Sequence, residues 1–209
     1  MPKIVDHDER RREVLAAARR VIVRDGIDAA TTRAIAKEAG YSNGVLAHYF
    51  ADKDEILLSA LRQSHQRIRE RLTGKVGDAS GLAALRELLL DNLPLDAERT
   101  QESRLEVSFW SRSLASERLA GMQRAEADEL RAVVRELLGQ ARAAGELRGD
   151  HPDDGLDDLA EHLLALVDGL SLHLLLYPDR LNRVDVERLM LRALDRLSTG
   201  AIVRIRTTD

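Results

Sequence analysis

The chain of 209 residues contains no cysteine. It can therefore hold neither a disulfide framework nor a thiolate-bound metal, and this absence fits the reducing cytoplasm. The first thirteen residues contain no apolar run, so they do not form a signal peptide. Six histidines are scattered along the chain without metal-ligand spacing, and no nucleophile elbow is present. We therefore expect a cytoplasmic protein that is not an enzyme and that binds no metal or cofactor.

Long hydrophobic runs are also scarce. The longest spans residues 163–176 and is interrupted by Asp168, Gly169, Ser171 and His173, which makes it too short and too polar to cross a membrane. Aromatic residues make up only 3% of the chain, leucine and alanine dominate, and no segment shows the alternation of a strand. This composition predicts an all-α protein of one or two domains with a substantial core.

Residues 32–49 are the most informative segment, because they predict two short helices joined by a tight turn. Ala36 falls where two helices cross closely, and Gly40 falls where the first helix must end with a positive φ. Thr31 and Ser42 are suited to cap the two helices. This spacing is typical of a helix-turn-helix, although small-residue and glycine spacing alone fits an ordinary helical hairpin equally well. The residues expected to face inward are Ile35, Ala36, Ala39 and Leu46.

The flanking sequence favours a DNA-binding motif. Asp52 and Glu55 form the pattern of a capping box that opens another helix, with Asp52 as N-cap and Glu55 at N3. Residues 9–24 carry an apolar stripe at offsets of three and four, which predicts a helix that ends at Asp25 and Gly26. Three helices and a long connecting helix therefore fill the N-terminal third of the chain.

The charge distribution points the same way. Residues 1–75 carry a net charge of +4, whereas residues 76–209 carry −8. The basic part is the one that contains the helix-turn-helix, as attraction to phosphate requires. Within it, Arg10, Arg11 and Arg12 are either a solvated helix start or a further phosphate contact.

A larger set of residues is shared with a known family: Thr31, Thr32, Arg33, Ile35, Ala36, Ala39, Gly40, Ser42, Gly44, His48, Tyr49, Phe50, Lys53, Leu57 and Leu58. On these residues the N-terminal part resembles the tetracycline-repressor-type (TetR) transcriptional regulators, and the ending of the second motif helix is similar to the choline-repressor-like (BetI-like) branch. Two positions depart from the family pattern. An aromatic residue, Tyr41, stands in the turn, and Ala47 replaces the tyrosine that touches phosphate in many members.

The resemblance implies an N-terminal helix-turn-helix DNA-binding domain in residues 1–52, a connecting helix and linker in residues 53–75, and a C-terminal ligand-binding and dimerisation domain in residues 76–209. It implies a regulator, by family default a repressor, that binds a near-palindromic DNA operator as a homodimer and is released by a small molecule. The alternative is a helical interaction module that contacts protein without binding DNA.

The exposed side of the second motif helix is expected to read bases. Asn43 can pair bidentately with adenine, and Val45 can contact a thymine methyl group. Arg33, Tyr49 and Lys53 are candidates for phosphate contact. Packing beneath the helix is the alternative for His48 and Tyr49. The predicted DNA-binding residues are Thr32, Arg33, Ser42, Asn43, Gly44, Val45, His48, Tyr49 and Lys53.

The C-terminal part is expected to be helical after a glycine-rich linker at residues 73–81. The helices are expected near residues 82–92, 98–114, 116–145, 154–176 and 184–198. Leucines cover nearly every face of the fourth of these, and a helix that is apolar all round must be buried all round. Together with the stripe of the fifth it predicts a four-helix bundle between two copies, with burial inside one chain as the alternative. The predicted interface residues are Leu163, Leu166, Leu170, Leu174, Val186, Met190, Ala193 and Leu197.

The family resemblance also implies an effector cavity in the C-terminal region, lined by apolar residues with a few polar groups. Core packing is the alternative for Phe109 and Trp110, and a structural role is the alternative for His162. The predicted ligand-binding residues are Arg104, Phe109, Trp110, Met122, His162 and Tyr177.

Overall fold

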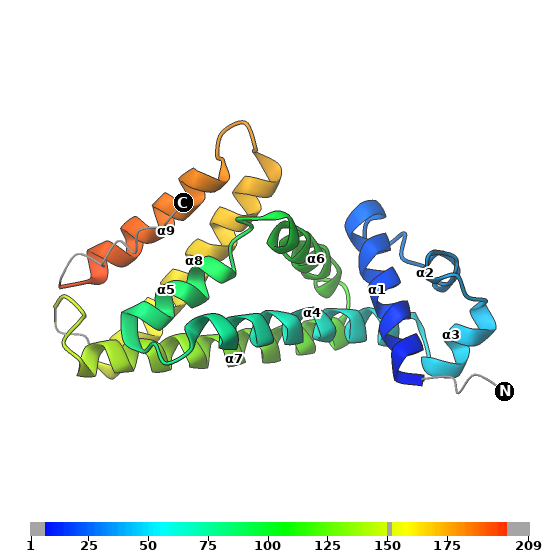
Figure 1. The fold of residues 1–209 in the computed structure, drawn as a ribbon, viewed down its shortest axis with the longest axis horizontal. Coiled ribbons are helices and arrows are strands. Elements are labelled where there is room, and N and C mark those ends of the chain that lie inside the picture. The colour runs from blue at the N-terminus through cyan, green and yellow to red at the C-terminus, as the bar shows by residue number, and fades with distance from the viewer. Residues whose placement is uncertain (1–6, 150–151, 200–209) are drawn as a thin grey trace. The chain divides into compact units, whose positions relative to one another are not determined.

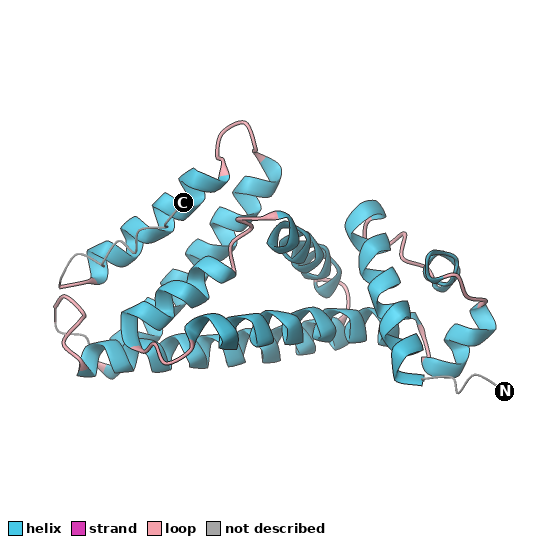
Figure 2. Cartoon of the chain, in the orientation of Figure 1, coloured by secondary structure: helices cyan, strands magenta, loops and turns pink. Residues whose placement is uncertain are grey.

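The computed structural model describes residues 7–149 and 152–199. This part of the chain forms nine α-helices and no strand, with one isolated bridge between Leu147 and Ser198 (Figures 1 and 2). The predicted all-α class is confirmed. The helices are α1 His7–Asp25, α2 Thr32–Ala39, α3 Asn43–Tyr49, α4 Lys53–Val76, α5 Gly81–Asp91, α6 Ala97–Ser113, α7 Glu117–Ala143, α8 Asp153–Leu176 and α9 Arg183–Leu197.

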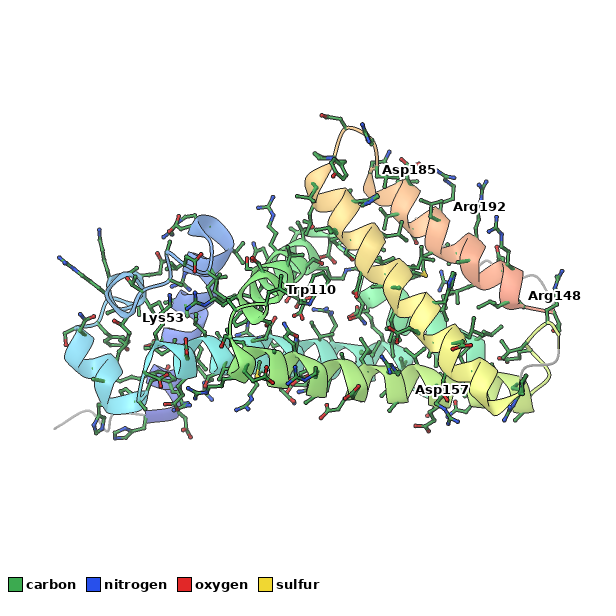
Figure 3. All side chains as sticks on the ribbon, turned by 180° about the vertical axis from the view of Figure 1, so that it is seen from behind. Lys53, Trp110, Arg148, Asp157, Asp185 and Arg192 are labelled. Atoms are coloured by element: carbon green, nitrogen blue, oxygen red, sulfur yellow. The ribbon has the colours of Figure 1, made fainter. Side chains whose placement is uncertain are left out.

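Local signals place most helix ends where the sequence predicts them. The five C-terminal helices begin and end within two residues of the expected positions. The linker is shorter than expected, because α4 continues through Gly74 to Val76 and the chain breaks at Gly77, whose φ is +51°. A capping box that the sequence analysis did not single out opens α9, between Asn182 and Asp185. Figure 3 labels Asp185 at the start of this helix.

The chain divides into two compact units. The first comprises Met1–Arg69 and Arg104–Arg124, and the second comprises Glu70–Ser103 and Ala125–Asp209. The first unit therefore combines the helices of the predicted DNA-binding domain with the second half of α6 and the start of α7. The functional boundaries expected at residues 52 and 75 stay a prediction.

The core of the first unit is made by α1 to α4 together with residues from the later segment. Ile22, Ile35 and Leu46 are almost fully buried in it. Leu105 and Phe109 of α6, which lie 59 and 63 residues after Leu46, are 0% exposed in the same cluster. The helix-turn-helix is thus supported by a core that the N-terminal helices do not complete on their own.

The second unit packs α5, α8 and α9 against one another. Its core joins Leu85 and Leu89 of α5 to Val134 of α7, Leu163 of α8 and Met190 of α9. All five are at most 1% exposed. The apolar stripe of α9 and one side of α8 are therefore buried inside the chain.

Helix α8 has more apolar surface than this core uses. By length and composition alone, residues 155–176 could cross a membrane, and 28% of an 18-residue apolar stretch among them is buried within the chain. The interrupted run of residues 163–176 had predicted a segment too short and too polar for this, but the helix begins ten residues earlier. One such helix does not define a membrane protein, because core helices of soluble proteins have the same length and composition.

Candidate nucleic-acid interface

Helices α2 and α3 have the geometry of a helix-turn-helix. The Thr31 hydroxyl accepts a hydrogen bond from the Ala34 N–H at 3.1 Å, and the Ser42 hydroxyl accepts one from the Val45 N–H at 3.4 Å. Gly40 ends α2 with a φ of +75°, a conformation in which a side chain would be strained. The two predicted N-caps and the predicted glycine turn are confirmed.

Helix α3 keeps one side buried and leaves the other open. Leu46 is 2% exposed and anchors the helix in the core, as predicted. Val45 is half-buried. An added Cβ at Gly44 would meet only the Ser42 Oγ at 3.7 Å, an ordinary contact, so the fold itself does not require glycine there. The exposed positions of the turn and helix are Ser42, Asn43, Gly44, Ala47 and His48.

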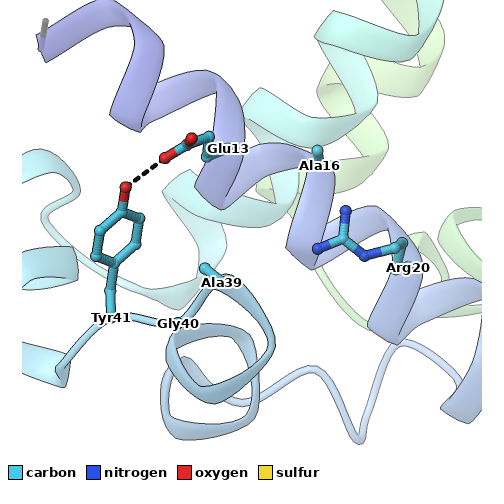
Figure 4. A pocket seen from close by; sticks show the side chains of 6 residues that line it. All are labelled: Glu13, Ala16, Arg20, Ala39, Gly40 and Tyr41. Atoms are coloured by element: carbon cyan, nitrogen blue, oxygen red, sulfur yellow. Dashed lines mark hydrogen bonds between the residues drawn. The ribbon is translucent and has the colours of Figure 1, made fainter.

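Tyr41, which departs from the family pattern, fastens the turn to α1. Its hydroxyl donates a hydrogen bond to the Glu13 carboxylate (Figure 4), and this bond raises the pKa of Tyr41. The Arg10 guanidinium carbon lies over the Tyr41 ring, 5.8 Å from the ring centroid, within cation–π range. Tyr41 therefore has a packing role that explains an aromatic residue in the turn.

Tyr49 and His48 belong to a small cluster of rings at the end of α3. The Tyr49 ring centroid lies 5.2 Å from that of His48 and 5.5 Å from that of His7, distances typical of aromatic pairs. His48 is exposed, whereas Tyr49 is half-buried. The packing interpretation of Tyr49 is thus observed, and its phosphate contact stays a prediction.

The cations of this unit differ in how freely they can reach phosphate. Arg33 and Lys37 are exposed and lie one helical turn apart on α2, and neither pairs with another described residue. Lys53 donates from Nζ to the Ile27 carbonyl at 3.4 Å (Figure 3). The sequence analysis selected Arg33 as a candidate phosphate contact but not Lys37. The spacing of four residues places both side chains on one face of α2, so Lys37 could have been selected with Arg33.

The start of α4 is filled by the chain's own carboxylates. Asp52 Oδ1 accepts from the Glu55 N–H at 2.7 Å, and Glu55 Oε2 accepts from the Ala51 N–H at 2.6 Å. The predicted box is therefore modified, because Glu55 reaches the residue before the N-cap. These backbone hydrogen bonds hold the pKa of Asp52 and of Glu55 below its ordinary value. The Glu55 N–H, one of the free N–H groups at this helix start, is therefore already occupied by a carboxylate, and the phosphate contact of Lys53 stays a prediction.

The predicted ligand-binding residues fall in both compact units. Arg104, Phe109, Trp110 and Met122 belong to the first unit, and His162 and Tyr177 to the second. Phe109 is buried because it belongs to the hydrophobic core of the first unit, and Met122 packs against the same core. Trp110 is half-buried and donates from Nε1 to Glu106 at 3.1 Å, whereas His162 and Tyr177 are exposed. Among the described residues, no group of three or more His, Asp or Glu side chains could hold a metal ion.

The predicted interface residues also separate into two groups. Leu163, Leu170, Val186 and Met190 are at most 7% exposed and lie in the chain's own core, because one stripe of each helix packs inside the chain. The half-buried residues, which retain surface for a partner, are Leu166, Leu174, Ala193 and Leu197.

The fold and the exposed face of α3 define a helix-turn-helix protein. Two family profiles match the chain: that of bacterial regulatory proteins of the tetR family over residues 14–60, and that of the C-terminal region of BetI-type transcriptional repressors over residues 81–199. The chain belongs to the TetR family of transcriptional regulators, as the resemblance implied.

Individual relatives agree with this assignment. The chain is 34% identical over 193 residues to the transcriptional regulator PksA of Bacillus subtilis, covering 92% of this chain and 91% of that protein. It is 31% identical to the regulator BetI of Stenotrophomonas maltophilia, covering 82% and 84%. Among solved structures, a transcriptional regulator from Rhodococcus shares 27% identity with a TM-score of 0.78, covering 90% and 95%. A regulator from Saccharomonospora viridis in complex with choline has a TM-score of 0.85 at 22% identity, covering 93% and 100%, and so supports the fold alone.

Proposed function

We propose that this chain is a cytoplasmic, ligand-responsive repressor that binds a near-palindromic operator as a homodimer and is released by a small molecule. The observation that carries this proposal is the exposed face of α3, which we take as the recognition helix. Asn43 and His48 are exposed on it and Leu46 anchors it in the core, while side-chain caps at Thr31 and Ser42 begin α2 and the recognition helix. A helix presented in this way fits the major groove of DNA.

Base reading falls to the start of α3 and phosphate contact to α2 and α4. Asn43 would pair with adenine, and the half-buried Val45 would offer its remaining methyl surface to thymine. Arg33 and Lys37 would contact phosphate from α2, and the remaining donors of Lys53 would do so from α4. Since Ala47 cannot make the contact of the family's tyrosine, the two unpaired cations of α2 supply a replacement.

A homodimer accounts for the apolar surface of α8. The helix is apolar on nearly every face, yet only 28% of an 18-residue apolar stretch of it is buried within the chain. A second copy, packing its own α8 and α9 on the same surface, would bury both in a four-helix bundle. We call the part of each copy that contains α1 to α4 its reading head. Two reading heads held in this way could occupy successive major grooves.

The effector remains defined by class only, as a small molecule bound in the C-terminal region. A structural neighbour holds choline, and an organic cation is therefore the first ligand to test. One recess of the second unit is largely polar, and none of the predicted ligand residues lines it. The residues that line it are Lys75, Arg86, Glu87, Leu90, Asp91, Leu95, Arg99 and Glu187.

The decisive experiment is selection of duplexes from a random pool with the full chain, followed by anisotropy titrations of the enriched duplex over a range of salt concentrations. We expect an enriched near-palindrome and an affinity that falls steeply with salt, together with a dimer in sedimentation equilibrium. Absence of duplex binding at low salt would refute the repressor and favour the protein-interaction module.

A further inference from the structure

The three consecutive arginines at the start of α1 have three different surroundings. Arg10 lies over the Tyr41 ring, and Arg12 is exposed. Arg11 instead turns toward the end of the recognition helix, with its side chain 39% exposed. Sequence alone treated the three as equivalent, whereas the structure separates Arg11 from the other two.

Arg11 joins three elements of the reading head. Its Nη1 donates to the backbone carbonyl of Tyr49 at 2.9 Å. Its Nη2 lies 3.4 Å from Glu55 Oε1 and 3.4 Å from Ser59 Oγ, both on α4. Its guanidinium carbon lies 4.5 Å from the centroid of the Phe50 ring. One side chain therefore links α1, the last residue of α3 and the first two turns of α4.

The recognition helix needs such support because it is short. Helix α3 has seven residues, Asn43–Tyr49, and a helix of this length is not stable through its own hydrogen bonds. The final carbonyls of a helix lack partners within it, and a cation at that end is stabilised by the helix dipole. Arg11 satisfies the Tyr49 carbonyl and stacks on the buried Phe50 that follows, so it fixes the C-terminal end of α3 against α1 and α4.

We propose, on the basis of the operator binding proposed above, that Arg11 is a positioning residue for operator recognition and not a phosphate contact. Both of its Nη groups are engaged by Tyr49, Glu55 and Ser59, and its charge is neutralised in part by Glu55. Its effect on DNA passes through the orientation of α3, which decides how Asn43 meets a base edge. Loss of Arg11 should therefore reduce discrimination between operator and random DNA.

The test compares Arg11→Met and Arg11→Lys with two matched variants, Arg12→Met and Arg33→Met. For each, the affinity for the selected operator, the affinity for a random duplex and the slope of log K against log salt are measured at equal active concentration. Arg11→Met should weaken operator binding about tenfold, the change expected for one charge-assisted hydrogen bond, with random-duplex affinity and salt slope unchanged. Arg33→Met should lower both affinities and reduce the slope by about 0.9, as loss of one phosphate contact does.

Arg11→Lys should recover only part of the operator affinity, since an ammonium group can donate to the Tyr49 carbonyl but cannot also stack on Phe50 and reach α4. If Arg11→Met does not fold, Arg11→Lys alone tests the proposal, which then requires a lower ratio of operator affinity to random-duplex affinity than in the wild type. Equal losses on both duplexes with a reduced slope would show that Arg11 contacts phosphate, and unchanged affinities for both duplexes would show that it positions nothing. Failure of the wild-type chain to bind any duplex would instead refute the repressor function itself.

Discussion

A buried charge network in the second compact unit offers a quantitative test of what holds that unit together. The Arg71 guanidinium donates from Nε to both oxygens of Asp91, at 3.2 and 3.0 Å, and from Nη1 and Nη2 to the two oxygens of Glu102, at 2.9 and 2.8 Å. The Asp91 side chain is 0% exposed and that of Glu102 is 6% exposed. Lys75 also pairs with Asp91. The network therefore ties the end of α4 to α5 and α6.

Replacement of Arg71 by methionine should be strongly destabilising. Removing one partner of a buried ion pair costs about 3–5 kcal/mol, because the other charge stays buried without compensation. Lys75 still neutralises Asp91 after the change, so the uncompensated charge is that of Glu102. We therefore expect a loss near the lower limit, about 3 kcal/mol, which corresponds to a fall in Tm of roughly 6–12 °C for a chain of this size.

The measurement is urea unfolding followed by circular dichroism at fixed protein concentration, since a dimer makes apparent stability depend on concentration. The double variant Arg71→Met/Glu102→Met is the informative control. Because it removes both the cation and the stranded carboxylate, it should be more stable than Arg71→Met alone. A loss below about 1 kcal/mol for the single variant, as for exposed pairs, or a double variant less stable than the single one, would refute this account of the network.

Three further outcomes follow from the reading head. Asn43→Ala should weaken operator binding by about 1–3 kcal/mol in anisotropy titrations, and an equal loss on random DNA would contradict base reading. Gly44→Ala should leave the thermal melt unchanged, since its Cβ meets only ordinary contacts, yet weaken operator affinity if the backbone approaches DNA there. Because the pKa of Asp52 and of Glu55 is lowered in the folded chain, both carboxylates contribute stability above their ordinary pKa of about 4, and this stability is lost as pH falls further. Thermal melts at acid pH should therefore depend less on pH for Asp52→Asn than for the wild type. Identical pH profiles would exclude the effect.

The helix ends were predictable because their determinants are local. Thr31, Gly40 and Ser42 act on neighbours within a few residues, and so do Asp52 and Glu55. The exposed side of α3 follows from the same period, since Leu46 must face inward. The linker was predicted to begin too early, because α4 includes Gly74 and continues to Val76, although glycine has a weak helix propensity.

The long-range arrangement was not predictable from one sequence. Arg11 reaches Tyr49 and Ser59 across 38 and 48 residues, and no local pattern distinguishes it from the arginines beside it. The faces of α8 could not be assigned either, because a helix with leucine on nearly every side has no periodic signal that separates core from interface. Leu163 and Leu166 look alike in the sequence, yet the first is in the core and the second is half-buried.

The reading head is not a separable N-terminal piece of this chain. Its core includes Phe109 of α6 and Leu119 of α7, which lie within the span matched by the BetI-type C-terminal profile. The chain also passes between the compact units inside helices α4, α6 and α7, and never at a loop. A helix transmits a shift along its axis better than a flexible linker does. If the proposed function holds, an effector that favours one arrangement of the second unit can change operator affinity only by as much as its own affinity differs between arrangements of the chain, and this limit applies whatever the effector is.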